Sequence, residues 1–264
     1  MTELIGFALA VVIGISLGLI GGGGSILTLP ILVYLLGINP ILSTAYSLFI
    51  VGATSLVGSV GYMKKGLVNY KTAIIFAIPS FLAVFLTRKY LVPAIPEQLF
   101  QVFGYEVSKD FAIMVLFAIV MLMASYSMIS DKKPEADSSE KLQYNIPLIA
   151  LEGFVVGTLT GIVGAGGGFL IIPALVILVK LPMKMAVGTS LLIIAAKSLI
   201  GFVGDLSTQV IDWKFLLTFT FLSIIGIFIG SYLTKFIPGE KLKKSFGWFV
   251  LLMAIYILLK EFMG

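Results

Sequence analysis

The chain has 264 residues, of which 59% are hydrophobic and 12% are charged, and its formal net charge is +5. A soluble domain has about 25% charged residues, and a water-soluble fold of this size could not bury so much apolar surface in one core. Cysteine and histidine are both absent, which excludes disulfides, Cys/His metal sites and Ser-His-Asp chemistry. We therefore predict an all-α integral membrane protein, whose positive charge reflects basic cytoplasmic loops rather than nucleic-acid binding.

Apolar segments follow one another along the chain, five in each half, and predict about 8–10 transmembrane helices. They lie near 3–20, 25–37, 41–63, 71–91 and 108–128, and then near 146–164, 168–180, 184–204, 214–236 and 243–262. The hydrophilic stretch SDKKPEADSSEKLQ has the composition of a flexible linker. The chain thus divides into a first membrane repeat (1–128), a linker expected in the cytoplasm (129–145) and a second membrane repeat (146–264).

The two halves resemble each other at a constant offset of 143 residues. GISLGLIGGGGSILTLP from Gly14 aligns with GTLTGIVGAGGGFLIIP from Gly157, and SLFIVGATSLVGSVG (47–61) aligns with SLLIIAAKSLIGFVG (190–204). Proline and serine are matched as well as glycine, at Pro30/Pro173, Ser47/Ser190 and Ser55/Ser198. A gapless register of this length indicates an internal duplication.

Loop charges predict how the two halves are oriented. The loop 64–71 contains three lysines and no acid, whereas its equivalent 205–214 contains two aspartates and one lysine. Loops rich in Lys and Arg prefer the cytoplasm, which would place both termini outside and four stretches inside, namely 64–71, 129–145, 180–184 and 235–244. Equivalent loops would then lie on opposite sides, as in the inverted-topology repeats of many secondary transporters. A parallel repeat is the alternative.

Glycine runs precede the two segments that are too short to span a bilayer. As helices, 25–37 and 168–180 would each cover roughly 20 Å of a hydrocarbon core of about 30 Å. Glycine permits an unwound backbone, and the N–H groups that begin the next helix attract anions. We therefore predict substrate-binding roles for Gly22, Gly23, Gly24, Ser25, Gly166, Gly167 and Gly168. The alternative is that these glycines only permit close helix packing.

Lys197 lies in the middle of an apolar segment, where a charge costs about 2.5–3.5 kcal/mol on insertion scales. Its equivalent in the first half is Thr54, so we expect one charged site rather than two. Our hypothesis is that Lys197 binds an anion with the help of three hydroxyl groups, those of Thr54, Ser55 and Ser198. The alternative is a structural ion pair with Glu152, which is also the candidate for coupling transport to a proton.

These repeated motifs resemble the TauE/SafE family of sulfite exporters and sulfonate permeases. The likeness lies in GLIGGGGS (18–25) and GIVGAGGG (161–168), each followed by a proline, and in two apolar halves joined by a linker. It covers nearly the whole chain, and it implies a carrier for sulfite, sulfoacetate or another organosulfonate in a prokaryotic plasma membrane. Only the glycine runs are carried over from the family, and the role of Lys197 is inferred from its position alone.

The expected partners are a small anionic substrate and the lipid bilayer. The nucleotide-binding pattern GxxxxGK[ST] is absent, so we expect coupling to a proton or sodium gradient rather than to ATP, without a cofactor or metal. An enzyme is disfavoured because the apolar segments carry few acid–base groups. An anion channel of the same architecture is the alternative to a carrier.

Overall fold

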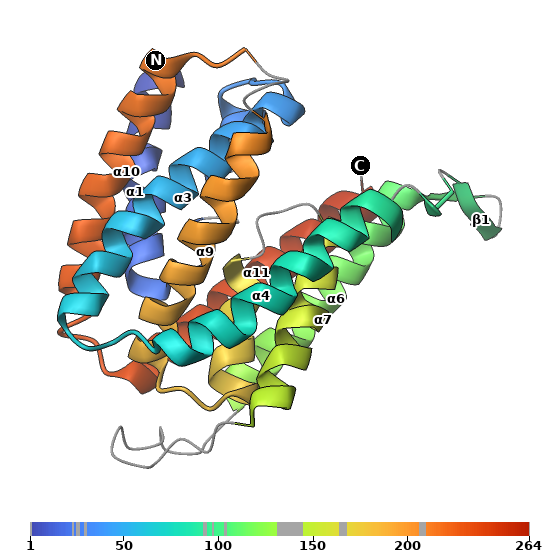
Figure 1. Cartoon of the computed structure of the whole chain (residues 1–264). Coiled ribbons are helices and arrows are strands. Elements are labelled where there is room, and N and C mark those ends of the chain that lie inside the picture. The colour runs from blue at the N-terminus through green and yellow to red at the C-terminus, as the bar shows by residue number, and fades with distance from the viewer. Residues whose placement is uncertain are drawn as a thin grey trace.

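Helices form nearly all of this computed structural model, which describes residues 2–22, 24, 27–28, 31–91, 94–96, 98–102, 105–130, 145–163, 168–205 and 210–263 (Figure 1). The first half contains α1 (Thr2–Ile20), the π-helical turn η1 (Ile31–Leu35), α3 (Pro40–Lys64), α4 (Tyr70–Leu86), the π-helical turn η2 (Thr87–Leu91), strands β1 (Gln98–Val102) and β2 (Tyr105–Ser108), and α6 (Lys109–Ser130). The second half contains α7 (Ile146–Val163), α8 (Gly168–Pro173), the π-helical turn η3 (Ala174–Leu178), α9 (Met183–Asp205), α10 (Trp213–Leu233) and α11 (Gly239–Met263).

Six helices of the described residues are long and apolar enough to cross a membrane, and α1 and α7 are shorter apolar helices. Their bounds lie within a few residues of the predicted apolar segments. Two equivalent N-caps, Asn69 and Asp212, begin α4 and α10, where each side-chain oxygen accepts a hydrogen bond from the backbone N–H three residues further on. The predicted all-α membrane fold is confirmed.

Two stretches differ from the prediction. The short segment 168–180 is not one α-helix but α8 followed by η3, and η1 occupies the position equivalent to η3 at the offset of 143. The stretch between the predicted apolar segments 71–91 and 108–128, for which no secondary structure was predicted, contains an antiparallel hairpin in which Val102 pairs with Tyr105. Apolar and polar residues alternate in YEVS, as is typical of a strand, whereas QLFQV departs from alternation at Leu99 and Phe100, where the register of the hairpin is irregular.

The two halves are interlocked rather than side by side. The first helix of each half packs against the fourth helix of the other half, so α1 lies along α10 and α7 lies along α4. The third helices, α3 and α9, pack against each other, as do the last helices, α6 and α11. Figure 1 shows two groups of helices, one containing α1, α3, α9 and α10 and the other containing α4, α6, α7 and α11. The contact of α1 with α10 therefore has an equivalent in the contact of α7 with α4.

Glycines bring the backbones of the two halves into contact. A side chain at Gly14 of α1 would collide with the carbonyl oxygen of Ser223 on α10, and a side chain at the equivalent Gly157 of α7 would collide with that of Ser80 on α4. Ser223 and Ser80 are themselves equivalent residues. Small residues allow such close packing of membrane helices. For these positions, packing is the role that the structure shows.

The contacts also determine the relative directions of the helices. Gly52 of α3 lies against Leu199 of α9, whereas Gly58, further along α3, lies against Leu191, earlier in α9. The equivalent helices α3 and α9 therefore run in opposite directions. Two hydrogen bonds between the halves are also equivalent. Asn69 N–H donates to Thr189 Oγ1 over 3.0 Å, and Asp212 N–H donates to the Tyr46 hydroxyl over 2.8 Å. Asp212 is the equivalent of Asn69, and Thr189 is the equivalent of Tyr46. These contacts support an inverted repeat, which remains a prediction with respect to the bilayer.

We predict that Gly157→Ala lowers stability by about 1–3 kcal/mol, because its methyl group would enter the backbone of α4. Gly61→Ala is the matched control, since nothing lies within 4 Å of the position of its added carbon. In this helix the control should be neutral or more stable by up to about 1 kcal/mol. Thermal unfolding of the purified variants in detergent measures both effects. Equal unfolding temperatures would contradict the packing role of Gly157.

The inverted repeat predicts that Lys65 and Val210 lie on opposite sides of the membrane. They stand in equivalent loops, both side chains are exposed, and the chain has no native cysteine. With a membrane-impermeant maleimide, we expect Lys65→Cys to react only from the cytoplasmic side and Val210→Cys only from outside. Labelling of both cysteines from one side would instead indicate a parallel repeat.

Candidate functional site

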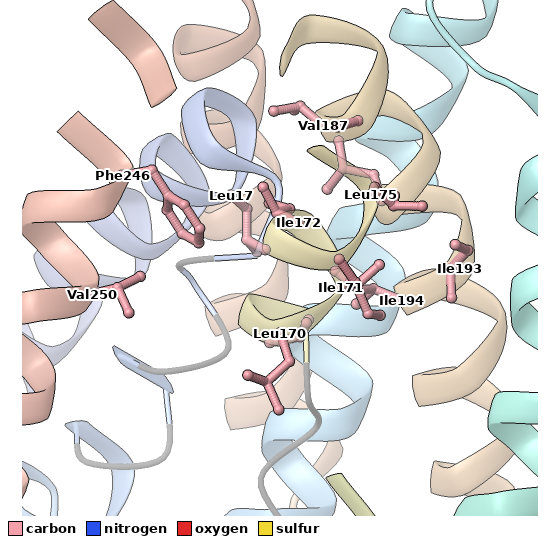
Figure 2. Packing of buried hydrophobic residues seen from close by; sticks show 14 of the residues in the cluster. Leu17, Leu170, Ile171, Ile172, Leu175, Val187, Ile193, Ile194, Phe246 and Val250 are labelled. Atoms are coloured by element: carbon pink, nitrogen blue, oxygen red, sulfur yellow. The ribbon is translucent and has the colours of Figure 1, made fainter. Parts of the chain in front are cut away.

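The short helix α8 lies in the hydrophobic core (Figure 2). Ile171 and Ile172 are fully buried and belong to the same cluster of apolar residues as Leu17 of α1. Gly168, the first residue of α8, is buried as well. The second predicted half-helix therefore begins inside the protein, where membrane proteins tolerate irregular backbone because it is covered or lines a cavity.

The first glycine run forms a tight buried turn at the end of α1. Gly21 has a φ of +74°, which favours glycine, and its N–H donates to the carbonyl oxygen of Leu17 over 2.7 Å. A side chain at Gly21 would come within 2.7 Å of the hydroxyl of Ser190 on α9. Gly22 and Gly24 are buried too. The backbone of this turn therefore lies close to α9.

Four predicted residues, Gly23, Ser25, Gly166 and Gly167, fall outside the described residues. The described parts of both runs, Gly22, Gly24 and Gly168, lie in the interior. A pocket shared by the two turns therefore remains a prediction.

Thr54 and Ser55 lie in the middle of α3, where it crosses α9. By the register of Gly52 with Leu199 and Gly58 with Leu191, Thr54 is level with Lys197. Both hydroxyl oxygens are fully buried and have no hydrogen-bonding partner. Hydroxyls in helices usually bond to a carbonyl of the preceding turn, so these two groups keep their capacity to bind a ligand.

Lys197 binds a neutral hydroxyl group from another helix. Its Nζ donates to Thr160 Oγ1 of α7 over 2.8 Å. Thr160 in turn donates to the carbonyl oxygen of Gly157 over 3.0 Å, which leaves its oxygen oriented as an acceptor. Ser198, the next residue on α9, is 1% exposed. The predicted cation is therefore partly buried and lies between α9 and α7.

Glu152 does not form the ion pair that was considered as an alternative role for Lys197. Its side chain is buried in α7, 6% exposed, and neither carboxyl oxygen has a hydrogen-bonding partner. The two ionisable groups are instead connected along α7, because Glu152 lies two turns before Thr160. The structure places the coupling candidate near the candidate anion site without a direct bond between them.

Thr160 is a contact of Lys197 that the sequence did not indicate. Its equivalent in the first half is Leu17, so the duplication gave no signal for a polar role. The spacing could have revealed it, because Glu152 and Thr160 are eight residues apart and fall on the same side of a helix.

Lysines from three separate loops gather at one end of the molecule. Lys65, just after α3, donates to the carbonyl oxygen of Ser231 on α10 over 3.4 Å. Burial, followed by the charges of Lys235 and Lys184, lowers the pKa of Lys65 below its usual value. Three of the loops predicted to be cytoplasmic, 64–71, 180–184 and 235–244, therefore meet at the same end. This arrangement agrees with the predicted orientation.

Comparison with known proteins supplies the family. The model of the family described as sulfite exporter TauE/SafE matches residues 6–257. A "Probable membrane transporter protein" of Xylella fastidiosa strain 9a5c is 29% identical over 251 residues, which are 93% of this chain and 91% of the relative. The "Probable membrane transporter protein YunE" of Bacillus subtilis strain 168 is 29% identical over 281 residues, with 96% and 95% of the two chains covered.

A third similar protein, a "Probable membrane transporter protein" of Methanocaldococcus jannaschii, is 36% identical over 118 residues, or 42% of this chain and 44% of the relative. The family match spans both membrane repeats and the linker. Together with the apolar helices, these similarities identify the chain as a multi-pass membrane transporter that belongs to the TauE/SafE family of sulfite exporters.

Proposed function

We propose that this chain is a secondary carrier of a small sulfur-containing anion, either sulfite, sulfoacetate or another organosulfonate, in a prokaryotic plasma membrane. The observation that carries the proposal is the position of Lys197. Its ammonium group lies within a membrane-spanning helix and is bound to the neutral hydroxyl of Thr160. Ionisable groups at this depth usually mark the path of a substrate or ion.

Three kinds of group that could bind an anion lie within the helix bundle. Besides the ammonium group of Lys197, the partnerless hydroxyls of Thr54 and Ser55 lie on α3, at the level of Lys197 along the neighbouring helix. The helical stretch formed by α8 and η3 begins at the buried Gly168. Backbone N–H groups at such a start favour negative charge. In the proposed site, Lys197 supplies charge and the hydroxyl and amide groups supply directional hydrogen bonds.

Alternating access follows from the interlocked halves in this proposal. The equivalent helices α3 and α9 run in opposite directions, and each half contributes equivalent contacts to the other. Exchange of conformation between the halves would expose a central site first to one side and then to the other. The known relatives come from bacteria and an archaeon, which supports a plasma-membrane location.

We expect Lys197→Met to reduce the apparent affinity for methanesulfonate and sulfoacetate by about ten- to a hundredfold, because a hydrogen bond to a charged group contributes about 1.5–3 kcal/mol. The assay is uptake of each labelled anion into liposomes that contain the purified protein. Lys214→Met is the matched control, since Lys214 is exposed beside the start of α10, and its uptake should be unchanged.

Normal uptake by Lys197→Met would contradict the proposed site. The same liposomes separate a carrier from a channel of the same architecture. A carrier gives saturable exchange and counterflow, whereas single-channel currents in a planar bilayer would overturn the carrier mechanism.

A further inference from the structure

We propose that Glu152 is the proton-binding site of this transporter, and that one proton crosses the membrane together with each monovalent anion. The inference rests on the proposed anion transport and adds the coupling ion. It starts from the burial of Glu152, whose side chain is 6% exposed and whose two carboxyl oxygens both lack a hydrogen-bonding partner. A carboxylate that is buried without a hydrogen-bonding partner costs several kcal/mol more than the neutral acid, so the surroundings of Glu152 favour binding of a proton.

A proton suits these surroundings better than a metal cation. Alkaline-earth cations need several oxygen ligands, and the described residues contain no group of three or more acidic, His or Cys side chains that could hold a metal ion. No oxygen or nitrogen of the described residues hydrogen-bonds the carboxyl group of Glu152. A proton needs only the carboxyl oxygen itself.

Few charged residues are available to face Glu152 from the neighbouring helices. The elements packed against α7 are α4, α6, η2, α8 and η3, and Thr160 adds α9 through its bond to Lys197. Their charged residues are Lys71, Arg88, Lys89, Lys109, Asp110, Lys184, Lys197 and Asp205. Thr87 of η2 packs at Gly161, near the other end of α7 from Glu152, and the hairpin joins η2 to the start of α6. Lys71 lies toward the Glu152 end of α7, since Phe76 of α4 packs at Gly153, but its side chain is exposed. Lys197 is the partly buried cation that contacts α7.

One face of α7 connects the two ionisable groups. Glu152, Val156 and Thr160 are spaced at four-residue intervals and all three are buried, so they form one stripe that extends about 12 Å along the helix. Thr160 accepts the hydrogen bond from Lys197. A movement of α7 relative to α9 would therefore change the surroundings of both groups at once.

Charge balance then predicts the stoichiometry. When the anion occupies Lys197, the ion pair is neutral, and the site as a whole is neutral only if Glu152 carries a proton. When the anion and the proton have both left, the carboxylate and the ammonium group together carry no net charge, although they lie two turns apart along α7. Neither form then has a net charge at membrane depth, where charge is costly, whereas movement of the anion alone leaves one form charged. The balanced cycle is symport of one proton with one monovalent anion.

The test uses labelled methanesulfonate, which keeps a single negative charge across the pH range of the assay. Purified protein is placed in liposomes with the membrane potential clamped at zero, and two activities are measured, exchange at equal pH and accumulation driven by a gradient of one pH unit, acidic outside. Proton symport predicts about tenfold accumulation by the wild type, because one pH unit is worth 1.36 kcal/mol. Glu152→Gln should keep exchange and lose the accumulation. Glu240→Gln should keep both, because Glu240 is an exposed carboxylate that pairs with Lys244 on α11.

Tenfold accumulation by Glu152→Gln would overturn the inference, and so would a wild type that exchanges the anion but responds to sodium rather than to pH. In both of these cases the proposed anion transport would stand. A wild type without exchange would refute the proposed function itself. If Glu152→Gln also loses exchange, Glu152→Asp decides, because it should retain pH-driven accumulation if the carboxyl group binds the proton. Loss of accumulation in Glu152→Asp would reject the inference.

Discussion

The structure depends on direct backbone contact between helices of different halves. Lipid is as apolar as a leucine side chain, so the hydrophobic effect does not hold membrane helices together, and close van der Waals packing must do so. Gly14 and Gly157 provide this packing, since each places its backbone against the carbonyl of a serine, Ser223 or Ser80, on a helix of the other half. Because both contacts join first to fourth helices, neither half has a complete set of helix partners of its own.

This interlocking leaves α3 and α9 as the shared middle layer. Each is flanked by helices from both halves, since α3 also packs on α10 and α9 also packs on α4. Both helices also have exposed apolar side chains, such as Leu56 on α3 and Ile200 on α9, but several of their polar residues are buried. Thr54, Ser55 and Ser198 are each at most 1% exposed there, and Lys197 joins this layer to α7. The scaffold thus creates a position where polar groups can face one another instead of lipid.

The scaffold is duplicated but the chemistry is not. Caps, π-helical turns and glycine contacts recur at the offset of 143 residues, down to the hydrogen bonds of Asn69 and Asp212. The three polar positions Glu152, Thr160 and Lys197 correspond instead to Leu9, Leu17 and Thr54. A symmetric frame can serve two opposite conformations equally well, whereas the proposed polar site occurs only once in that frame. The two copies have therefore kept the residues that pack the helices together and have diverged at these three polar positions.

The sequence by itself determined the membrane fold, the number and bounds of most helices and the duplication, because hydropathy over about 20 residues and a gapless repeat are local signals. It also identified Lys197 and Glu152, since a charge inside an apolar segment stands out. It did not reveal the hairpin β1–β2, the composite α8–η3 stretch or the role of Thr160. Only the tertiary structure decided that Lys197 binds Thr160 while Glu152 keeps no partner. Partner choice depends on how helices distant in the chain are rotated and crossed, and that is set by packing across the two halves.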